Sequence, residues 1–454
     1  MSLDFLLRTP EFGALSRAVA SSERPLLVRG VVEPAKAYLL ACLAGTAGRP
    51  IVLIRPESAP LAQAERDCRF YLDRLAPHAG LAALPPLADD PYFEVPPALD
   101  AVSSRMRLFH RLLNAPPALI VTSLGGLLKP VPAQADMAGL FLSLETGGEA
   151  DHDALLETLG RYGYAREDLI ASPGEFAWRG GIVDVFSPWE ANPFRIEFDG
   201  SRVASLREFD ISNQRSVRRI DRLTVPSLRE FPATPEFLDV WKAAARGRGK
   251  GARRDLEAKI AAVDRGEFGP SFAALALLAE GRFVPVTDYL REPVFVVEDP
   301  EAVDGEWDER LKELHGQFDD LRAGRAFACE PDAVFPPSLL RRVRAEAVRL
   351  EGLGAPAREK AFAFGFQPVP RFDNRIPFFL QYLKKLRSES DLCSIYVLNA
   401  GTRRRLAALL RESDIPALET DSPFAIAPRG EIALLIGALP GGFSYPREKL
   451  HVFS

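Results

Sequence analysis

The residues after the first apolar run are candidates for chemistry, because they occupy the place of a phosphate-binding loop. A working loop reads GxxxxGKS or GxxxxGKT, in which backbone amides cradle the phosphates and the lysine reaches the outer ones. Here Gly30 opens the turn, but the sequence continues VVEPAKAYLL. The second glycine is missing, Ala37 follows Lys36 in place of a hydroxyl residue, and Glu33 adds negative charge. We expect a degenerate, non-functional nucleotide loop, with Lys36 as a solvated helix residue.

An acidic pair ends the apolar run 293–297, where a nucleotide-hydrolysing enzyme would hold magnesium. Glu298 and Asp299 stand there, and Pro300 follows directly. Because the phosphate loop is degenerate as well, we expect a strand cap or a relic and no metal site.

Two arginines lie in a stretch that organises the middle of the chain. Arg179 and Arg195 lie in the stretch 172–216, which contains short apolar runs. Around Arg195, apolar residues alternate with Arg195 and Glu197, so the apolar set faces a core and the charged set faces water. This pattern indicates a display surface and no enclosed reaction site. On composition alone, arginines that merely decorate a solvated face are the plainer interpretation.

The elements that would position these residues form two kinds of sheet. Short runs at hairpin spacing predict a small antiparallel sheet, preceded by a helix over 151–162 and closed by 221–231; the runs are 181–186, 193–198 and 202–206. Continuous apolar runs separated by helix-length segments predict a parallel α/β sheet covered on both faces, helicase-like or Rossmann-like; these runs are 25–28, 51–54, 118–122 and 293–297.

The last part of the chain predicts a separate small α/β domain. An extended lead-in at 367–372 is followed by alternating helices and strands, predicted at 376–386, 394–398, 402–412 and 431–436, and by a terminal strand LHVF. Upstream, Met106, Phe109, Leu112 and Leu113 repeat at helical spacing and predict an amphipathic helix.

Two further stretches have weaker signals. In a proline-rich loop, Tyr92 or Phe93 could contact a ligand, although simple packing of the loop is favoured. The segment 246–259, RGRGKGARRDLEAK, could touch nucleic acid; the favoured interpretation is an exposed, partly flexible linker into a helix.

Composition bounds the class of protein. With 454 residues and 47% hydrophobic residues, we expect about three or four domains, each with a core. A net charge of -5 argues against a surface that binds nucleic acid throughout, although local basic patches stay possible. No apolar run approaches a membrane span, no secretory leader is evident, and a cytoplasmic location is expected. We expect no histidine metal site and free, mostly buried thiols at Cys42, Cys68, Cys329 and Cys393.

The stretch 176–216, FAWRGGIVDVFSPWEANPFRIEFDGSRVASLREFDISNQRS, strongly resembles a signature shared by the excision-repair helicase UvrB and the N-terminal half of bacterial transcription-repair coupling factors (the Mfd family). DDPYFEVPPALDAVSSRMRLFHRLLNAPPALIVTSLGGLLKPVP, VTDYL before VFVVEDPE, GFQPVPRF and LPGGFSYPREKLHVFS resemble the coupling factors specifically. The resemblance covers essentially the whole chain.

The resemblance implies a degenerate helicase-like domain that cannot bind ATP, with an inserted β-rich domain and a small α/β domain after it. The implied limits are 1–145 and 231–356 for the two parts of the helicase-like domain, 146–230 for the insertion and 357–454 for the last domain. The inserted domain is expected to recruit UvrA, the damage-recognition ATPase, through positions that match Arg179, Arg195 and Phe198. One departure is Asp199, which stands where the family has a second aromatic residue and raises the question of weaker binding.

The family continues with an RNA-polymerase-binding domain and a translocase that uses ATP and magnesium, and this chain has no such motif. We expect an N-terminal part of a longer protein, with a natural short form as the alternative. Polymerase and double-stranded DNA would be bound through the missing part. For this chain we expect a monomer without enzymatic activity, cofactor or membrane contact. The alternative function is a divergent UvrB-like ATPase or helicase fragment with nucleotide-dependent DNA binding.

Overall fold

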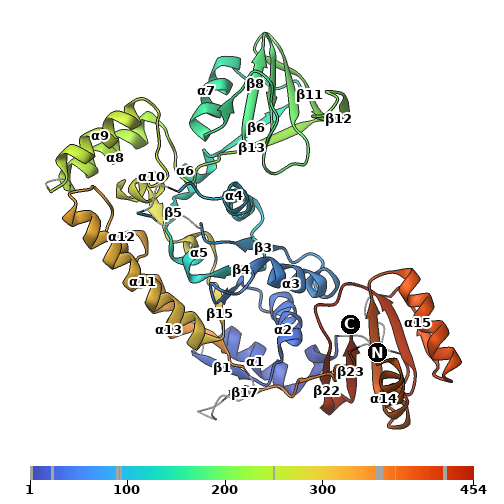
Figure 1. Ribbon diagram of the computed structural model, residues 1–454. Helices are drawn as coiled ribbons and strands as arrows, with labels where there is room; N and C mark the ends of the chain where they lie inside the picture. The colour runs from blue at the N-terminus through green and yellow to red at the C-terminus, as the bar shows by residue number, and fades with distance from the viewer. Residues whose placement is uncertain are drawn as a thin grey trace.

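Strands from two distant parts of the sequence form one parallel sheet of seven strands (Figure 1). The computed structural model describes residues 4–21, 25–87, 91–92, 95–248, 251–352, 361–373, 375–422 and 427–454. In spatial order the strands are β17 (Ala361–Ala363), β1 (Leu26–Arg29), β16 (Val348–Leu350), β15 (Val294–Glu298), β2 (Ile51–Arg55), β4 (Leu119–Ser123) and β3 (Leu81–Leu84). All neighbours are parallel, which confirms the α/β class. The sequence did not indicate β3.

Helices cover both faces of this sheet, as continuous apolar strands require. One face packs against α1 (Pro10–Ser21), α2 (Glu33–Thr46) and α3 (Leu61–Leu75). The other packs against the predicted amphipathic helix α4 (Leu99–Asn114), and against α5 (Leu124–Leu128), α11 (Pro300–Ala323) and α13 (Pro337–Glu346). Short elements complete this body: α6 (Gln134–Ala138) and the antiparallel pair β5 (Val131–Pro132) and β14 (Phe283–Val284).

A β-rich unit is inserted between β4 and β15. Its six-stranded sheet has the order β12 (Ser216–Ile220), β11 (Arg202–Phe209), β10 (Phe194–Asp199), β9 (Ile182–Val185), β8 (Glu175–Arg179), β7 (Ala165–Arg166), and it is antiparallel except for the parallel pair β7–β8. The helix α7 (His152–Tyr162) shares the apolar core of this sheet, and Asp151 caps its first turn. The expectation that 221–231 closes the sheet is wrong. Instead, β13 (Arg222–Pro226) pairs with β6 (Phe141–Glu145) in a separate two-stranded sheet. Leu223 and Val225 of β13 pack into the apolar core that the six-stranded sheet shares with α7.

The inserted unit is fastened to α4. The indole of Trp189 donates to the carbonyl of Ser103 at 3.1 Å, and the guanidinium of Arg107 donates to the carbonyl of Trp189 at 2.7 Å. Arg105, which is fully buried, pairs with Glu230 at 2.6 Å. These contacts fix the orientation of the inserted sheet on the parallel body.

A helical hairpin follows the insertion. It consists of α8 (Pro235–Arg248) and α9 (Arg253–Asp264), whose apolar faces pack with α10 (Phe272–Leu275) and α12 (Pro331–Val334). The described residues of the basic segment 246–259 end α8 at Arg248 and lead into α9 at Arg253, so the expectation of an exposed linker into a helix is confirmed in part. The helical part is longer than expected, because α8 tolerates Gly247 in its last turn.

The last part of the chain forms a second, mixed sheet. Its order is β18 (Gln367–Pro368), β22 (Phe443–Tyr445), β23 (Leu450–Phe453), β19 (Leu392–Val397), β21 (Ile432–Ile436), β20 (Ala417–Glu419), with α14 (Ile376–Ser388) and α15 (Ala400–Glu412). The predicted helices and strands are all present. This sheet shares a core with α2, where the ring centroids of Tyr38 and Phe443 lie 5.8 Å apart.

Smaller expectations are also answered by the fold. All four cysteines are buried and free, as predicted. The hydroxyl of Tyr92 donates to the carbonyl of Cys329 at 2.8 Å, which agrees with simple packing; Phe93 lies outside the described residues. Across the described ranges, no helix is both long and apolar enough to cross a membrane.

Candidate functional site

One face of the inserted sheet points away from its main core and is mostly polar, although Ala177 on this face is buried in a small apolar cluster with Ile170, Phe186 and Phe209. Directly opposed side chains of an antiparallel ladder share a face. One row across the strands consists of Arg179, Ile182, Glu197 and Ser205. The next row consists of Ala177, Asp184, Arg195, Arg207 and Arg219. We call these nine residues the outward face; it holds both predicted arginines, with β9 between their strands.

Arg195 is the most constrained arginine of the outward face. Its Nε and Nη2 atoms donate to the two carboxylate oxygens of Asp184 at 2.7 and 2.8 Å, and Nη2 also donates to Gln214 at 3.2 Å. The guanidinium carbon lies 4.6 Å from the ring centroid of Phe209. The hydrogen bond that Arg195 donates to the carboxylate of Asp184 raises the pKa of Arg195, so the guanidinium stays charged. A two-point pair of this kind holds the guanidinium in one orientation.

Arg179 is exposed at the end of β8, and its Nη2 atom donates to the carbonyl of Asp168 at 3.0 Å. Phe198 lies apart from both arginines. It is out of phase with Arg195 on β10, and its ring meets His152 of α7 edge-on, with 5.4 Å between centroids. Asp199, at the exposed end of β10, lies on the same side of the strand as Arg195 and Glu197. The predicted role of Phe198 as a partner contact stays a prediction.

The charge on the outward face is unbalanced. Arg207 contacts Glu197 at 3.1 Å, which also accepts from the hydroxyl of Ser205 at 2.6 Å. Four arginines thus stand against one aspartate and one glutamate, in a chain whose net charge is -5. Ile182 lies among them with 39% of its surface exposed. An exposed apolar side chain on a face with an excess of guanidinium groups suits an acidic protein surface better than a small substrate.

Sequence reasoning missed several residues of this face. Ile182 and Asp184 could have been found from the strand period of two, because Val183 and Val185 point inward and their neighbours must point outward. Gln214 and Phe209 could not, because they reach Arg195 across a bulge and a turn whose geometry the sequence does not state.

The degenerate nucleotide loop is closed by the chain itself. Gly30 has a φ of 70°, and a Cβ atom there would lie 1.8 Å from the carbonyl oxygen of Phe364. The carbonyl of Gly30 accepts from the amide of Phe366 at 3.0 Å. The glycine therefore lets two backbone segments approach, and this packing needs no phosphate.

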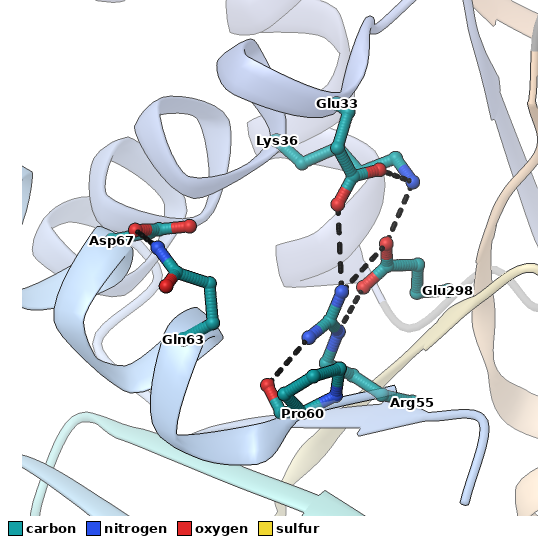
Figure 2. Close-up of polar contacts among 7 residues, drawn as sticks. All are labelled: Glu33, Lys36, Arg55, Pro60, Gln63, Asp67 and Glu298. Carbon is teal, nitrogen blue, oxygen red and sulfur yellow. Dashed lines mark hydrogen bonds and ion pairs between the residues drawn. The ribbon is translucent and has the colours of Figure 1, made fainter. Parts of the chain in front are cut away.

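Lys36 is engaged in a network of ion pairs (Figure 2). Its Nζ atom contacts Glu33 at 2.5 Å and Glu298 at 2.7 Å, and its side chain is only 14% exposed. Arg55 contacts the other oxygen of Glu298 at 2.6 Å and Glu33 at 3.4 Å. The expectation of a solvated lysine is wrong, because β15 brings Glu298 directly beside the start of α2.

The network sets the charge states of its members. Burial acts to raise the pKa of Glu298, but hydrogen bonding and attraction from Arg55 and Lys36 outweigh it and hold the pKa below its ordinary value. Burial acts to lower the pKa of Lys36, and the carboxylates of Glu298 and Glu33 outweigh it and raise the pKa. Lys36 and Glu298 are therefore both charged at neutral pH, and the charge of Lys36 is paired with carboxylates inside the chain.

Glu298 is therefore neither a strand cap nor an unused relic, because it forms buried ion pairs with Lys36 and Arg55. Asp299 next to it has a φ of 48° and precedes α11 without capping it through its side chain. Within the described residues, no group of three or more histidine, cysteine or acidic side chains is arranged to hold a metal ion.

A cavity of about 1270 Å³ lies between the start of α2 and the last sheet. Its walls include Glu33 and Lys36 on one side, and Arg375, Phe379 and Leu398 on the other. Because the charges of Glu33 and Lys36 are already paired with each other, this side of the cavity has no free cation for a phosphate group.

Comparison with known proteins gives two results. Residues 142–231 match the UvrB interaction domain family, a range that includes the outward face. The whole chain matches the transcription-repair-coupling factor of Mycobacterium bovis with 26% identity over 501 aligned positions, covering 100% of this chain and 38% of the relative.

Two other coupling factors show the same relationship. The Myxococcus xanthus protein is 30% identical over 321 positions, 67% of this chain and 26% of its own length. The Escherichia coli protein is 26% identical over 257 positions, 57% of this chain and 22% of its own length. The chain thus spans 38% or less of the length of these relatives.

Proposed function

Because the chain is homologous to transcription-repair coupling factors and carries a UvrB interaction domain at residues 142–231, we propose that it recruits UvrA to link stalled transcription to nucleotide excision repair. The observation that carries the proposal is the outward face. It presents one arginine held by an ion pair, Arg195, and one exposed arginine, Arg179, together with an exposed isoleucine, within the matched range.

The docking mode follows from the geometry of the outward face. Arg195 is held ready by Asp184, so little side-chain entropy is lost when a partner carboxylate binds its remaining donors. Arg179 has no acidic partner among the described residues and is free to pair with one on UvrA. Asp199 at the edge of this face repels acidic groups, which limits the contact on that side.

We further propose that this chain acts without nucleotide, metal or catalysis. Lys36 is committed to Glu298 and Glu33, and the turn at Gly30 is occupied by the backbone around Phe364. A bound triphosphate would have to displace these internal contacts. The translocation of DNA and the binding of RNA polymerase belong, in this proposal, to regions that this chain does not contain.

Titration calorimetry separates the two functions. We expect saturable binding when UvrA is titrated with the chain, and no heat of binding with ATP and magnesium. Absence of any complex with UvrA would contradict the recruiting role. Micromolar ATP binding that is lost in Lys36→Ala would instead favour the divergent ATPase.

A further inference from the structure

The connected ends of α8 and α9 carry arginines that the outward face does not use. α8 ends with Arg246 and Arg248, and α9 begins with Arg253 and Arg254. All four residues are exposed. Figure 1 shows these ends at the left edge of the molecule, away from the parallel sheet. We call the four residues the arginine tip.

Most of the arginine tip lacks acidic partners. Arg248 contacts Glu280 at 2.7 Å. In the described part of the chain, Arg246, Arg253 and Arg254 form no ion pair, although Glu257 stands one turn further along α9. Asp255 is engaged elsewhere: its Oδ2 atom accepts from Lys259 at 2.9 Å and from the amide of Phe327 at 2.8 Å.

The position of these charges is unfavourable for the isolated fold. Arg253 and Arg254 stand in the first turn of α9, where the unpaired amides already carry partial positive charge. Arg246 adds a like charge at the adjoining end of α8. A polyanion relieves this repulsion, whereas water only screens it.

The chemistry of the tip distinguishes between classes of polyanion. A protein interface is anchored by buried apolar side chains at its centre. The exposed large apolar residue on α8 is Val240, which lies outside the tip, and the sequence between the arginines of the tip consists of glycine, alanine and one lysine, Lys250, with no large apolar residue. Phosphate contacts need only such cations. We propose that Arg246, Arg253 and Arg254 bind the sugar–phosphate backbone of nucleic acid, without sequence preference.

This inference goes beyond UvrA recruitment and is independent of it. The overall charge of -5 repels nucleic acid, so we expect binding at the tip to be weak and strongly salt-dependent. Neutralising three phosphates gives a slope of about -2.7 in log K against log salt for a DNA duplex.

The test is fluorescence anisotropy of a fluorescein-labelled, mixed-sequence DNA duplex with the full chain at several salt concentrations. In the triple variant Arg246→Gln, Arg253→Gln, Arg254→Gln, we expect about tenfold weaker binding at low salt and a slope near zero. The matched control replaces Arg404, Arg405 and Arg411, three exposed arginines of α15, with glutamine and keeps the wild-type affinity and slope.

Three outcomes would overturn the proposal. These are no binding of the duplex by the wild-type chain at low salt, an equal loss in the control, and competition by poly-glutamate as effective as that by unlabelled DNA. Thermal melting followed by circular dichroism verifies that both triple variants are folded. We expect the tip variant to bind UvrA with unchanged affinity. If the tip does not bind DNA, the proposal that the chain recruits UvrA is therefore not affected.

Discussion

Arg195 and Asp184 stand opposite each other on β10 and β9 and form a two-point ion pair with distances of 2.7 and 2.8 Å. The side chain of Arg195 keeps 28% of its surface exposed and that of Asp184 keeps 14%. The pair is therefore accessible to a partner from one side only. It orients the arginine before any partner arrives.

Replacing Asp184 with asparagine tests this orienting role. In Asp184→Asn, the arginine stays but loses its charged partner, and we expect affinity for UvrA to fall by about 1–2 kcal/mol. In the background of Arg195→Ala, the same substitution has no further effect. Calorimetric titration of the double-mutant cycle measures this coupling. The control is Glu145→Gln, which breaks an exposed pair with Arg222 outside the outward face and leaves the affinity unchanged.

The network around Glu298 predicts a large effect on stability. Glu298→Gln leaves Lys36 and Arg55 buried without a full countercharge, and we expect a loss of about 3 kcal/mol in the free energy of unfolding. Urea unfolding followed by circular dichroism measures it. The control Glu313→Gln removes an exposed pair with Arg310 and costs less than about 0.5 kcal/mol. Equal losses in both variants would contradict the role of the network.

The lowered pKa of Glu298 predicts how the free energy of unfolding changes with pH. The pKa of Glu298 is lowered in the folded chain, so its contribution is complete above the unfolded value of about 4.3. It is lost as the pH falls from there through the folded pKa. The difference in unfolding free energy between the wild type and Glu298→Gln must therefore shrink on acidification. Urea titrations at a series of pH values measure this difference, and a gap that widens at low pH would be the opposite result.

Gly30 is expected to serve packing. In Gly30→Ala, the new Cβ meets the carbonyl of Phe364, and the positive φ adds backbone strain, so we expect a loss of about 2–4 kcal/mol. Gly48→Ala is the matched control, because Gly48 has a φ of 62° with nothing within 4 Å of its Cβ. That variant costs about 1 kcal/mol. Chemical denaturation measures the loss in unfolding free energy for both variants. Equal losses would show that Gly30 is not packed against Phe364.

Much of the fold could be predicted because its signals are local. The apolar runs that became β1, β2, β4 and β15 are continuous because helices bury these strands on both faces of the sheet, and such runs can be recognised from the sequence alone. The alternation around Arg195 placed Phe194 and Ile196 inside, where they are 3% and 0% exposed.

The errors arose where pairing across long distances decides the outcome. Lys36 looked solvated because its partner Glu298 is 262 positions away. β13 was assigned to the wrong sheet because strand order is set by packing of Leu223 and Val225 against a distant core. The extent of helix on both sides of the basic segment was missed because helix ends depend on packing of neighbours such as Trp241, which is fully buried.

The most direct test of the central claim is the affinity of UvrA for the outward face. UvrA is titrated in a calorimeter with the wild-type chain, with Arg179→Ala plus Arg195→Ala, and with Arg161→Ala. Arg161 lies on α7, which covers the opposite side of the sheet. We predict a loss of about 3 kcal/mol or more in the double variant and no change in the control. Undiminished binding by the double variant would contradict the assignment of this face to UvrA.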